Sequence, residues 1–336
     1  MTTNRPGTGL LIGADVGGTT TRLALADRTG HVLAVAEQPA GNPNAVGVET
    51  SAARIRTAID QLNVPSGARI DALLLGMAGF ATAQQAGDAF VTAAIPAAFG
   101  VRPRIVSDLA VAFSSATPRP SGTVVIAGTG SGAALIDSGE IVARRGAWGW
   151  LLGDEGAGFW LGREAVRQTL IEVEREADPG RRGPLTRRVI EQLQVDPEAP
   201  ISGLVRVPYL QTPVRLADLA PAVTELADQD PVAADICSRA ADQLAMLALD
   251  LHPVGGRPVV VSGSVLQAEG PIRAAFIDRL DRNAIGPVLD ARSGLVGALW
   301  LATATRPDGR PANVNDAALE LSTGRQIHAQ FLSEIG

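Results

Sequence analysis

The stretch Gly13–Leu25, GADVGGTTTRLAL, decides the fold class. An apolar run ends at Asp15, two glycines follow, and an alternating pattern then resumes, which predicts two strands joined by a tight turn. The backbone N–H groups of such a turn face outward and bind anions without a lysine. The stretch therefore predicts a phosphate-binding hairpin, although glycine for turn geometry and threonine for strand propensity would also explain the pattern.

The same order of features recurs further along the chain. Thr123–Arg144, TVVIAGTGSGAALIDSGEIVAR, repeats the strand, Gly-Thr turn, strand, glycine turn and strand of Ile12–Ala34. Chance similarity between two glycine-rich hairpins is the alternative, but the shared order favours duplication of one α/β domain. A duplicated domain implies a cleft between the halves, where ligands usually bind.

Strands alternate with helices along the chain, as in α/β proteins. The 336 residues exceed what one hydrophobic core usually covers, so we expect two domains, residues 9–118 and 119–336. The patterns predict helices at about 46–62, 83–97, 156–174 and 232–251, buried strands in DALLLGMAG, RIVSD and RPVVVSGSV, and a small-residue helix at 294–302.

Composition excludes several classes of function. The net charge is −6 and no basic block occurs, which argues against nucleic acid or an anionic membrane as partner. The chain contains 29 arginines and no lysine. This excludes a P-loop, which requires a lysine, and catalysis through a Schiff-base lysine. Cys237 is the only cysteine, which excludes a disulfide within the chain or a cluster with several cysteine ligands. Without a leader pattern or a long apolar run, we expect a cytoplasmic protein.

Both hairpins carry residues suited to a polyphosphate. The hydroxyls of Thr19, Thr20 and Thr21 add donors to the first turn, and Gly128–Ser131 forms a second donor-rich turn. Asp15 would repel phosphate directly, which makes sense if Mg²⁺ lies between them. Two such turns, one in each domain, predict a site that binds polyphosphate from both sides.

Three further segments allow two interpretations each. Asp108 follows an apolar strand and begins an apolar helix, which fits either a helix cap or a general base at a strand end. Asp154 and Glu155, between glycines and before a helix, suit either a helix N-terminus or a carboxylate that accepts sugar hydroxyls. Gly263 and Ser264 end a strand, where either a base and ribose or a plain turn fits.

One segment between these is rich in tryptophan. Trp148, Trp150 and Trp160 lie close to Asp154 in the sequence. They would form either an apolar wall beside a bound ligand or part of the core, and core packing is the more frequent fate of a single tryptophan.

Together these segments resemble the N-acetylglucosamine kinase-like branch of the sugar kinase/actin/heat-shock ATPase superfamily, the BadF-type ATPase family. The resemblance runs in order from Leu10 to Ala302, through DVGGTTTR, GMAGF, VSDLAVAF, GTGSGA, WGWLLGDEGAGFWLGREA, LADLAPAVTELADQDPVA and SGSV. The family includes ATPases that activate benzoyl-CoA reductase and 2-hydroxyacyl-CoA dehydratase. The Trp-Gly-x-x-x-Gly-Asp-Glu-Gly run is similar to the sugar kinases instead, and the activators need bridging cysteines that this chain lacks.

The resemblance implies a fold and an activity. The fold would be α/β, with two duplicated actin-like (ribonuclease H-like) domains, each a mixed five-stranded sheet flanked by helices, and an interdomain cleft. The activity would be transfer of phosphate from ATP, with Mg²⁺, to the 6-hydroxyl of N-acetylglucosamine. A small-molecule amino sugar would be the partner, and the protein would be a homodimer. A catalytically silent sugar sensor and a reductase-activating ATPase are the less favoured alternatives.

The resemblance also assigns roles by position. Asp15 resembles the residue that reaches Mg²⁺ through water, and Asp108 resembles the base that takes the proton of the sugar hydroxyl. ATP would contact Gly17, Gly18, Thr19, Thr20, Thr21, Gly128, Thr129, Gly130, Ser131, Gly263 and Ser264. The sugar would contact Asn44, Gly79, Asp108, Thr129, Gly130 and Asp154.

Two positions depart from the family pattern. Thr20 stands where many members have a basic residue, and Gly132 stands where some N-acetylglucosamine kinases have an asparagine that helps hold the sugar. The glycine weakens the case for N-acetylglucosamine in particular. Glucosamine therefore remains the alternative substrate.

Overall fold

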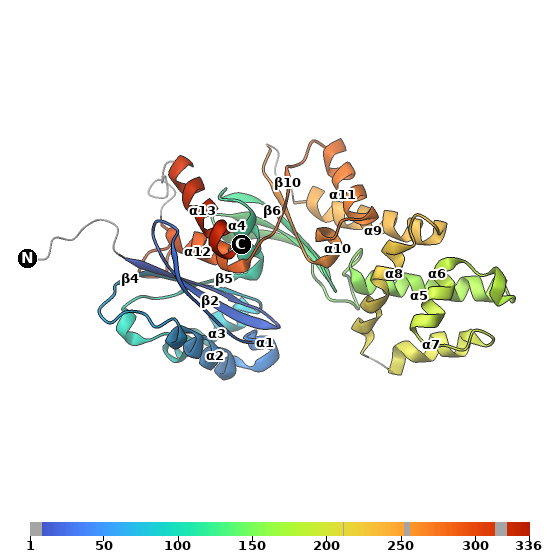
Figure 1. Cartoon of the computed structure of the whole chain (residues 1–336), viewed down its shortest axis with the longest axis horizontal. Helices are drawn as coiled ribbons and strands as arrows, with labels where there is room; N and C mark the ends of the chain where they lie inside the picture. Colours follow the sequence, from blue (N-terminus) through green and yellow to red (C-terminus); the bar gives the residue numbers. More distant parts are fainter. Residues whose placement is uncertain (1–8, 211, 252–255, 313–320) are drawn as a thin grey trace, which may run out of the picture. The chain divides into compact units, whose positions relative to one another are not determined.

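The computed structural model describes residues 9–210, 212–251, 256–312 and 321–336 (Figure 1). The described residues form two compact units. One lies within Met1–Gly122, Ile136–Val142 and Leu289–Gly336, and the other within Thr123–Leu135 and Ala143–Val288. The predicted domains, 9–118 and 119–336, differ from these units mainly in residues 289–336, which return to the first unit because helix α12 (Gly294–Thr303) packs on its first strand.

The first sheet has the strand order β3-β2-β1-β4-β5. Strands β1 and β2 pair antiparallel on both sides of the glycine turn, with Val16 opposite Thr21, and β3 pairs antiparallel with β2. Strands β4 and β5 run parallel to β1, so the carboxyl ends of β1, β4 and β5 lie at one edge of the sheet. The strands are β1 (Leu10–Val16), β2 (Thr20–Asp27), β3 (Val32–Pro39), β4 (Ile70–Met77) and β5 (Arg104–Ser107).

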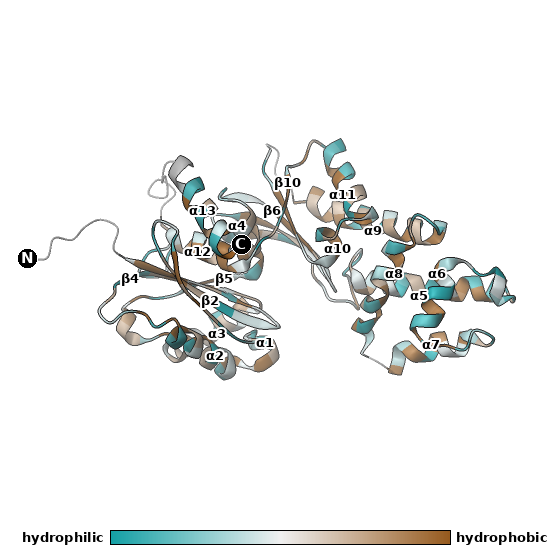
Figure 2. Ribbon diagram, viewed as in Figure 1, coloured by the Kyte–Doolittle hydropathy of each residue, from teal (hydrophilic) through white to brown (hydrophobic). Residues whose placement is uncertain are grey.

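Helices cover both faces of this sheet (Figure 1). Helices α2 and α3 pack together on one face, while α4 and α12 pack together on the other. Strand β4, IDALLLGM, is buried along its whole length. Figure 2, which colours each residue by hydropathy, shows brown, hydrophobic stretches in the strands of this sheet. The remaining elements of the unit are α1 (Pro43–Val46), α2 (Val48–Gln61), α3 (Phe80–Ala94), the 3-10 turn Ala97–Phe99, α4 (Asp108–Ala116) and α13 (Leu321–Ile335).

The second sheet repeats the strand order of the first. Read from its other edge, the order is β8-β7-β6-β9-β10, so each strand is the equivalent of the one five places earlier in the chain. Strands β6 and β9 pair in parallel, as β1 and β4 do. The strands are β6 (Ser121–Ala127), β7 (Ser131–Asp137), β8 (Glu140–Gly146), β9 (Val259–Ser262) and β10 (Val288–Asp290). This repeated order supports the predicted duplication.

The second unit is more helical than the first. Helix α5 begins where the predicted carboxylate segment ends, and it packs on α6, α8, α9 and a 3-10 turn around one apolar core. The elements are α5 (Gly158–Arg175), a turn at Pro179–Arg181, α6 (Pro184–Gln192), α7 (Pro200–Leu210), a turn at Pro213–Leu219, α8 (Ala220–Glu225), α9 (Pro231–Leu249), α10 (Ser264–Gln267) and α11 (Pro271–Arg282). No helix in the described ranges is both long enough and apolar enough to cross a membrane.

Candidate active site

The first glycine turn lies at the carboxyl end of β1. Gly17 N–H donates to Thr20 O at 2.8 Å and closes the turn, while Gly18 and Thr19 are exposed at its tip. The side chain of Thr20 is half-buried. The exposed backbone at Gly18 and Thr19 is therefore the part of this hairpin that a phosphate can reach.

Asp15 faces an arginine across the hairpin. The strand register places Asp15 opposite Arg22, and Arg22 Nη2 lies 3.3 Å from Asp15 Oδ2. Burial raises the pKa of the Asp15 carboxyl, the nearby Arg22 lowers it, and the negative charge of Asp108 adds to the rise. Arg22 was not among the predicted site residues. Its antiparallel register, with side chains of opposed residues on one face, is the signal that could have identified it.

Thr21 lies on the other face of β2. Its side chain is fully buried, and its hydroxyl lies so close to Gly41 that a side chain there would collide with it. The carbonyl of Gly17 accepts hydrogen bonds from the N–H groups of Gly41 and Asn42, both at 3.1 Å. The hairpin thus holds the segment that leads to the predicted sugar ligand Asn44.

Asn44 lies in a small cluster of polar groups. Thr82 Oγ1 donates to Asn44 Oδ1 at 2.6 Å, and Asn44 N–H donates to Asn42 Oδ1 at 2.9 Å. Gly79 has a left-handed backbone with a φ of 77°, and an added Cβ would lie 2.5 Å from Asn42 Oδ1 and 3.1 Å from the Asn44 amide. The structure therefore brings the predicted Asn44 and Gly79 together, along with Asn42 and Thr82.

Asp108 is the first residue of α4 and follows the carboxyl end of β5. Ser107 is the helix cap, because its hydroxyl accepts from Leu109 N–H at 3.2 Å. Ser107 Oγ also donates to Asp108 Oδ1 at 2.9 Å, and Leu109 N–H donates to the same oxygen at 3.0 Å. The Asp108 side chain is thus fixed through one oxygen while the residue is only half-buried.

The acidic groups of the first unit suit a cation that is bound mainly by nucleotide phosphates better than a metal ion coordinated by protein side chains alone. Within the described ranges, no group of three or more His, Cys, Asp or Glu residues could hold a metal ion. Mg²⁺ usually keeps several waters and binds through one or two carboxylates and substrate phosphates. Asp15, with Asp108 in electrostatic range, matches that sparse donor set.

The second glycine turn joins β6 and β7. Gly128 N–H donates to Gly130 O at 3.0 Å, and Thr129 is exposed at the tip. The start of α5 supports the turn from behind, since Gly158 N–H donates to Gly128 O at 2.8 Å and Phe159 N–H to Thr129 O at 3.1 Å. The first turn of α5 thereby fixes the backbone of this hairpin.

Asp154 lies directly against this hairpin. Its backbone is left-handed with a φ of 62°, and its side chain is almost fully buried. Ser131 N–H donates to Asp154 Oδ1 at 3.2 Å, and an added Cβ at Gly130 would lie 2.5 Å from Asp154 Oδ2. Ser131 Oγ donates to the carbonyl of Glu155 at 2.8 Å. Ser131 therefore holds the Asp154 segment, while Thr129 and Gly130 form the accessible part of the turn.

The predicted adenosine segment also touches the second hairpin. Gly263 has a left-handed backbone with a φ of 90°, and an added Cβ would lie 2.4 Å from Ala127 O and 2.7 Å from Gly128 N. Ser264 is exposed at the start of α10. The predicted phosphate hairpin, the predicted adenosine segment and Asp154 are therefore neighbours in the second unit.

The three tryptophans near Asp154 in the sequence do not form one wall. Trp160 is buried in the core, where the Arg239 guanidinium lies 5.3 Å from its ring centre. Trp150 contacts Phe159, with ring centres 5.4 Å apart, and Trp148 is 68% exposed.

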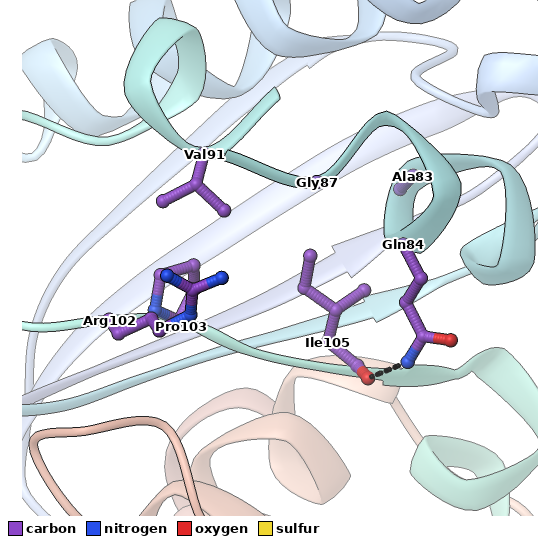
Figure 3. Close-up of a pocket in the computed structure, with 7 residues that line it drawn as sticks. All are labelled: Ala83, Gln84, Gly87, Val91, Arg102, Pro103 and Ile105. Atoms are coloured by element: carbon purple, nitrogen blue, oxygen red, sulfur yellow. Dashed lines mark hydrogen bonds between the residues drawn. The ribbon is translucent and has the colours of Figure 1, made fainter. Parts of the chain in front are cut away.

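The hollow shown in Figure 3 lies elsewhere in the first unit. It has a volume of about 180 Å³ and forms where α3 bends at Gly87, opposite the edge strand β5. Gln84 Nε2 donates to Ile105 O at 3.1 Å, as Figure 3 shows. None of the predicted site residues lines it, so we place the candidate site at the strand ends. Its lining residues are Ala83, Gln84, Gly87, Val91, Arg102, Pro103 and Ile105.

Comparisons with known proteins agree with the fold. Residues 12–302 match the model of the BadF/BadG/BcrA/BcrD ATPase family. The N-acetyl-D-glucosamine kinase of Dictyostelium discoideum is 28% identical over 231 residues, which span 65% of this chain and 71% of that protein. The solved structure of a candidate N-acetylglucosamine kinase from Chromobacterium violaceum is 28% identical to this chain, with a TM-score of 0.66. The match covers 88% of this chain and 99% of the Chromobacterium violaceum chain.

A more distant structure shares the fold alone. The ROK hexokinase from Thermus thermophilus is 18% identical to this chain, with a TM-score of 0.52. The match covers 87% of this chain and 97% of the hexokinase chain. The predicted fold is therefore confirmed: two duplicated actin-like units with mixed five-stranded sheets flanked by helices.

Proposed function

The chain belongs to the BadF/BadG/BcrA/BcrD ATPase family, and from this premise we propose that it is an ATP-dependent amino-sugar kinase. The names of the Dictyostelium discoideum and Chromobacterium violaceum relatives support a sugar as acceptor. The observation that carries the proposal is the pair of carboxylates, Asp15 and Asp108, at the carboxyl ends of β1 and β5, on either side of β4 and at the same edge of the sheet as a glycine hairpin.

Asp108 is the proposed base. Both hydrogen bonds described above reach Oδ1, and we assign Oδ2 to the sugar hydroxyl. As the hydroxyl proton moves to this carboxylate, the hydroxyl oxygen bonds to the γ-phosphorus. The bond from that phosphorus to the bridging oxygen breaks, and ADP leaves. Such a transfer needs alignment and charge stabilisation more than covalent chemistry.

Charge stabilisation comes from groups that do not include lysine. The backbone of exposed Gly18, Thr19 and Thr129 and of half-buried Gly130 would donate to phosphate oxygens. Arg22, beside Asp15, adds a positive charge to the first hairpin. Mg²⁺ bound with ATP would neutralise phosphate charge, and Asp15 would hold it through water.

N-acetylglucosamine, phosphorylated on its 6-hydroxyl, is the proposed substrate. The amide of Asn44 has its oxygen engaged by Thr82, which leaves its NH₂ group to donate to a sugar oxygen. The carboxylate of Asp154 would accept sugar hydroxyls. Glucosamine is the second candidate, because Gly132 replaces the asparagine that helps hold the sugar in some N-acetylglucosamine kinases. An added Cβ at Gly132 would lie 2.8 Å from Ala147 Cβ, so an asparagine would not fit here without a shift.

The sequence also bears on other classes of function. A reductase-activating ATPase needs cysteines to bridge its cluster, whereas Cys237 is the only cysteine here and is buried. A silent sugar sensor does not need Asp15 and Asp108, and both are present. The predicted homodimer and cytoplasmic location stay predictions.

A coupled ADP-release assay across N-acetylglucosamine, glucosamine, N-acetylmannosamine and glucose tests the proposal. We expect turnover with an amino sugar, and NMR of the product should locate the phosphate on the 6-oxygen. Asp108→Asn is the matched control for contaminating kinases. Absence of turnover with all four sugars at millimolar concentration would contradict the kinase proposal, and phosphate at another position would contradict the 6-hydroxyl assignment.

A further inference from the structure

Gly294 lies directly against the carboxylate of Asp15. An ideal Cβ on Gly294 would be 2.3 Å from Asp15 Oδ2, 2.4 Å from Cγ and 2.9 Å from Oδ1. Real Cβ atoms do not approach other heavy atoms this closely, so the carboxylate occupies the space of the missing side chain. Gly294 is the first residue of α12, in a helical position where alanine is intrinsically favoured over glycine. The space taken by Asp15, and not the backbone conformation, therefore accounts for the glycine.

Helix α12 is not free to move away from a new side chain. An added Cβ at Gly297 would lie 2.0 Å from the carbonyl oxygen of Val111 in α4. On the facing strand β1, an added Cβ at Gly13 would lie 2.7 Å from the N atom of Leu299. Both contacts involve backbone atoms of buried elements, which yield less than a flexible side chain does. A side chain at position 294 would therefore displace the Asp15 carboxylate.

Arg22 also contacts the Asp15 carboxylate. Arg22 Nη2 lies 3.3 Å from Oδ2, the same oxygen that lies closest to the Gly294 position. The carboxylate thus contacts both a guanidinium and the first turn of α12. The positive end of the α12 dipole also favours a negative charge there.

We propose that Gly294 is a positioning residue, which fixes the direction in which Asp15 presents its carboxylate to the cation of a bound nucleotide. The inference rests on the proposed function only in taking a nucleotide with a divalent cation as the ligand. In the proposed site Gly294 contacts neither ATP nor the sugar. It acts through Asp15, as residues behind metal ligands commonly do.

The first test measures ADP binding by calorimetry at increasing Mg²⁺ concentration. In Gly294→Ala we expect the Mg²⁺ concentration for half-maximal ADP affinity to rise about tenfold, the usual scale for such outer positions, with Mg²⁺-free ADP affinity unchanged. Gly270→Ala is the control, since Gly270 also stands at a helix start but an added Cβ meets nothing within 4 Å. An unchanged Mg²⁺ requirement in folded Gly294→Ala would overturn the proposal.

A second test works even if Gly294→Ala is unstable. Thermal unfolding is measured for Gly294→Ala alone and in the Asp15→Ala background. We expect Gly294→Ala to lower the melting temperature of the wild-type protein. In the Asp15→Ala background the same substitution should leave the melting temperature unchanged or raise it, because the carboxylate that would collide with the new Cβ is absent and alanine favours the helix. An equal fall in both backgrounds would overturn the proposal. Both tests are independent of the sugar, so a chain that phosphorylates no sugar refutes the kinase proposal without touching this one.

Discussion

Asp15 and Arg22 lie opposite each other on neighbouring strands, with Arg22 Nη2 3.3 Å from Asp15 Oδ2. The pair combines a cation and an anion at the base of the predicted phosphate hairpin in a chain without lysine. Arg22 offsets part of the effect of burial on the pKa of Asp15. The electrostatics of the hairpin therefore depend on a residue outside its glycine-threonine motif.

Replacement of Arg22 should alter both the pH profile and the affinity for ATP. Arg22→Ala removes the interaction that lowers the pKa of Asp15, so the acid limb of the kcat/KM profile should move to higher pH. Removal of a positive charge from the first hairpin should also raise KM for ATP about tenfold. Arg22→Lys keeps the charge and should show a smaller change in both. A profile that does not move in Arg22→Ala would show that Asp15 titration does not limit the reaction.

Asp15→Asn should make the metal-free protein more stable while abolishing turnover. Burial holds the pKa of Asp15 above its ordinary value of 3.8, so the folded state binds this proton more tightly than the unfolded state. The contribution of Asp15 to the free energy of unfolding therefore falls as pH rises from about 3.8 through the raised pKa. Asparagine removes that cost at neutral pH. The measurement is the melting temperature at pH 5 and pH 8, and a lower melting temperature for the variant at pH 8 would contradict the account.

Asp108→Asn should reduce kcat by about 10²- to 10⁴-fold, the usual contribution of a general base, with little change in ATP binding. Asparagine can keep the hydrogen bonds from Ser107 and Leu109 to Oδ1 and therefore the orientation of the side chain. Ser107→Ala removes one of these donors and the helix cap, and should lower kcat less. Steady-state kinetics with calorimetric ATP binding measures both effects. Near-wild-type turnover in Asp108→Asn would refute the role as base.

Asp154→Asn should weaken sugar binding and leave nucleotide binding intact. The variant keeps the hydrogen bond from Ser131 N–H but loses the charge that strengthens hydrogen bonds from sugar hydroxyls. We expect KM for the sugar to rise about tenfold, since a charged hydrogen bond contributes about 1.5–3 kcal/mol. Glu155→Gln is the matched control, because Glu155 is the exposed neighbour and contacts Ser131 through its backbone carbonyl. If both variants kept the wild-type KM, Asp154 would have no part in sugar binding.

His328 should make stability depend on pH below 6.5. Its Nε2–H donates to the carbonyl of Ser114 at 2.8 Å, its ring meets Trp300 edge-on, and burial lowers its pKa from 6.5. The unfolded state then binds more protons than the folded state between the lowered pKa and 6.5. The stability contributed by neutral His328 is present above 6.5 and is lost as pH falls through the lowered pKa. The melting temperature of His328→Gln should fall less than that of wild type between pH 7 and pH 5, and an equal fall would contradict this role.

Much of the fold follows from local patterns. The glycine-threonine hairpins, the alternation of strands and helices and the repeated order all predicted two equivalent sheets, and both are present. The predicted helix at 156–174 lies within two residues of α5 at both ends. These elements were predictable because apolar periodicity and glycine turns are properties of neighbouring residues.

What escaped prediction depends on contacts between distant segments. The burial of Thr21 follows from its strand face and from the return of Gly41 over it. The use of Ser131 to hold Asp154, and the support of Asn44 by Thr82, join residues 23 and 38 positions apart. Arg22 could have been assigned from the hairpin register, but the contact of Asp15 with Gly294 joins residues 279 positions apart (294 − 15). Local periodicity carries no information on such contacts.

The return of residues 289–336 to the first unit has a consequence for synthesis on the ribosome. By the time residue 122 has emerged, all five strands of the first sheet have been made, but α12, which packs on β1 and β4, is still untranslated. Fully buried residues on that side, such as Val111 in α4, then lack their partner. Completion of the first unit must await the last seventh of the chain, residues 289–336, so the second unit is the first whose residues have all been made.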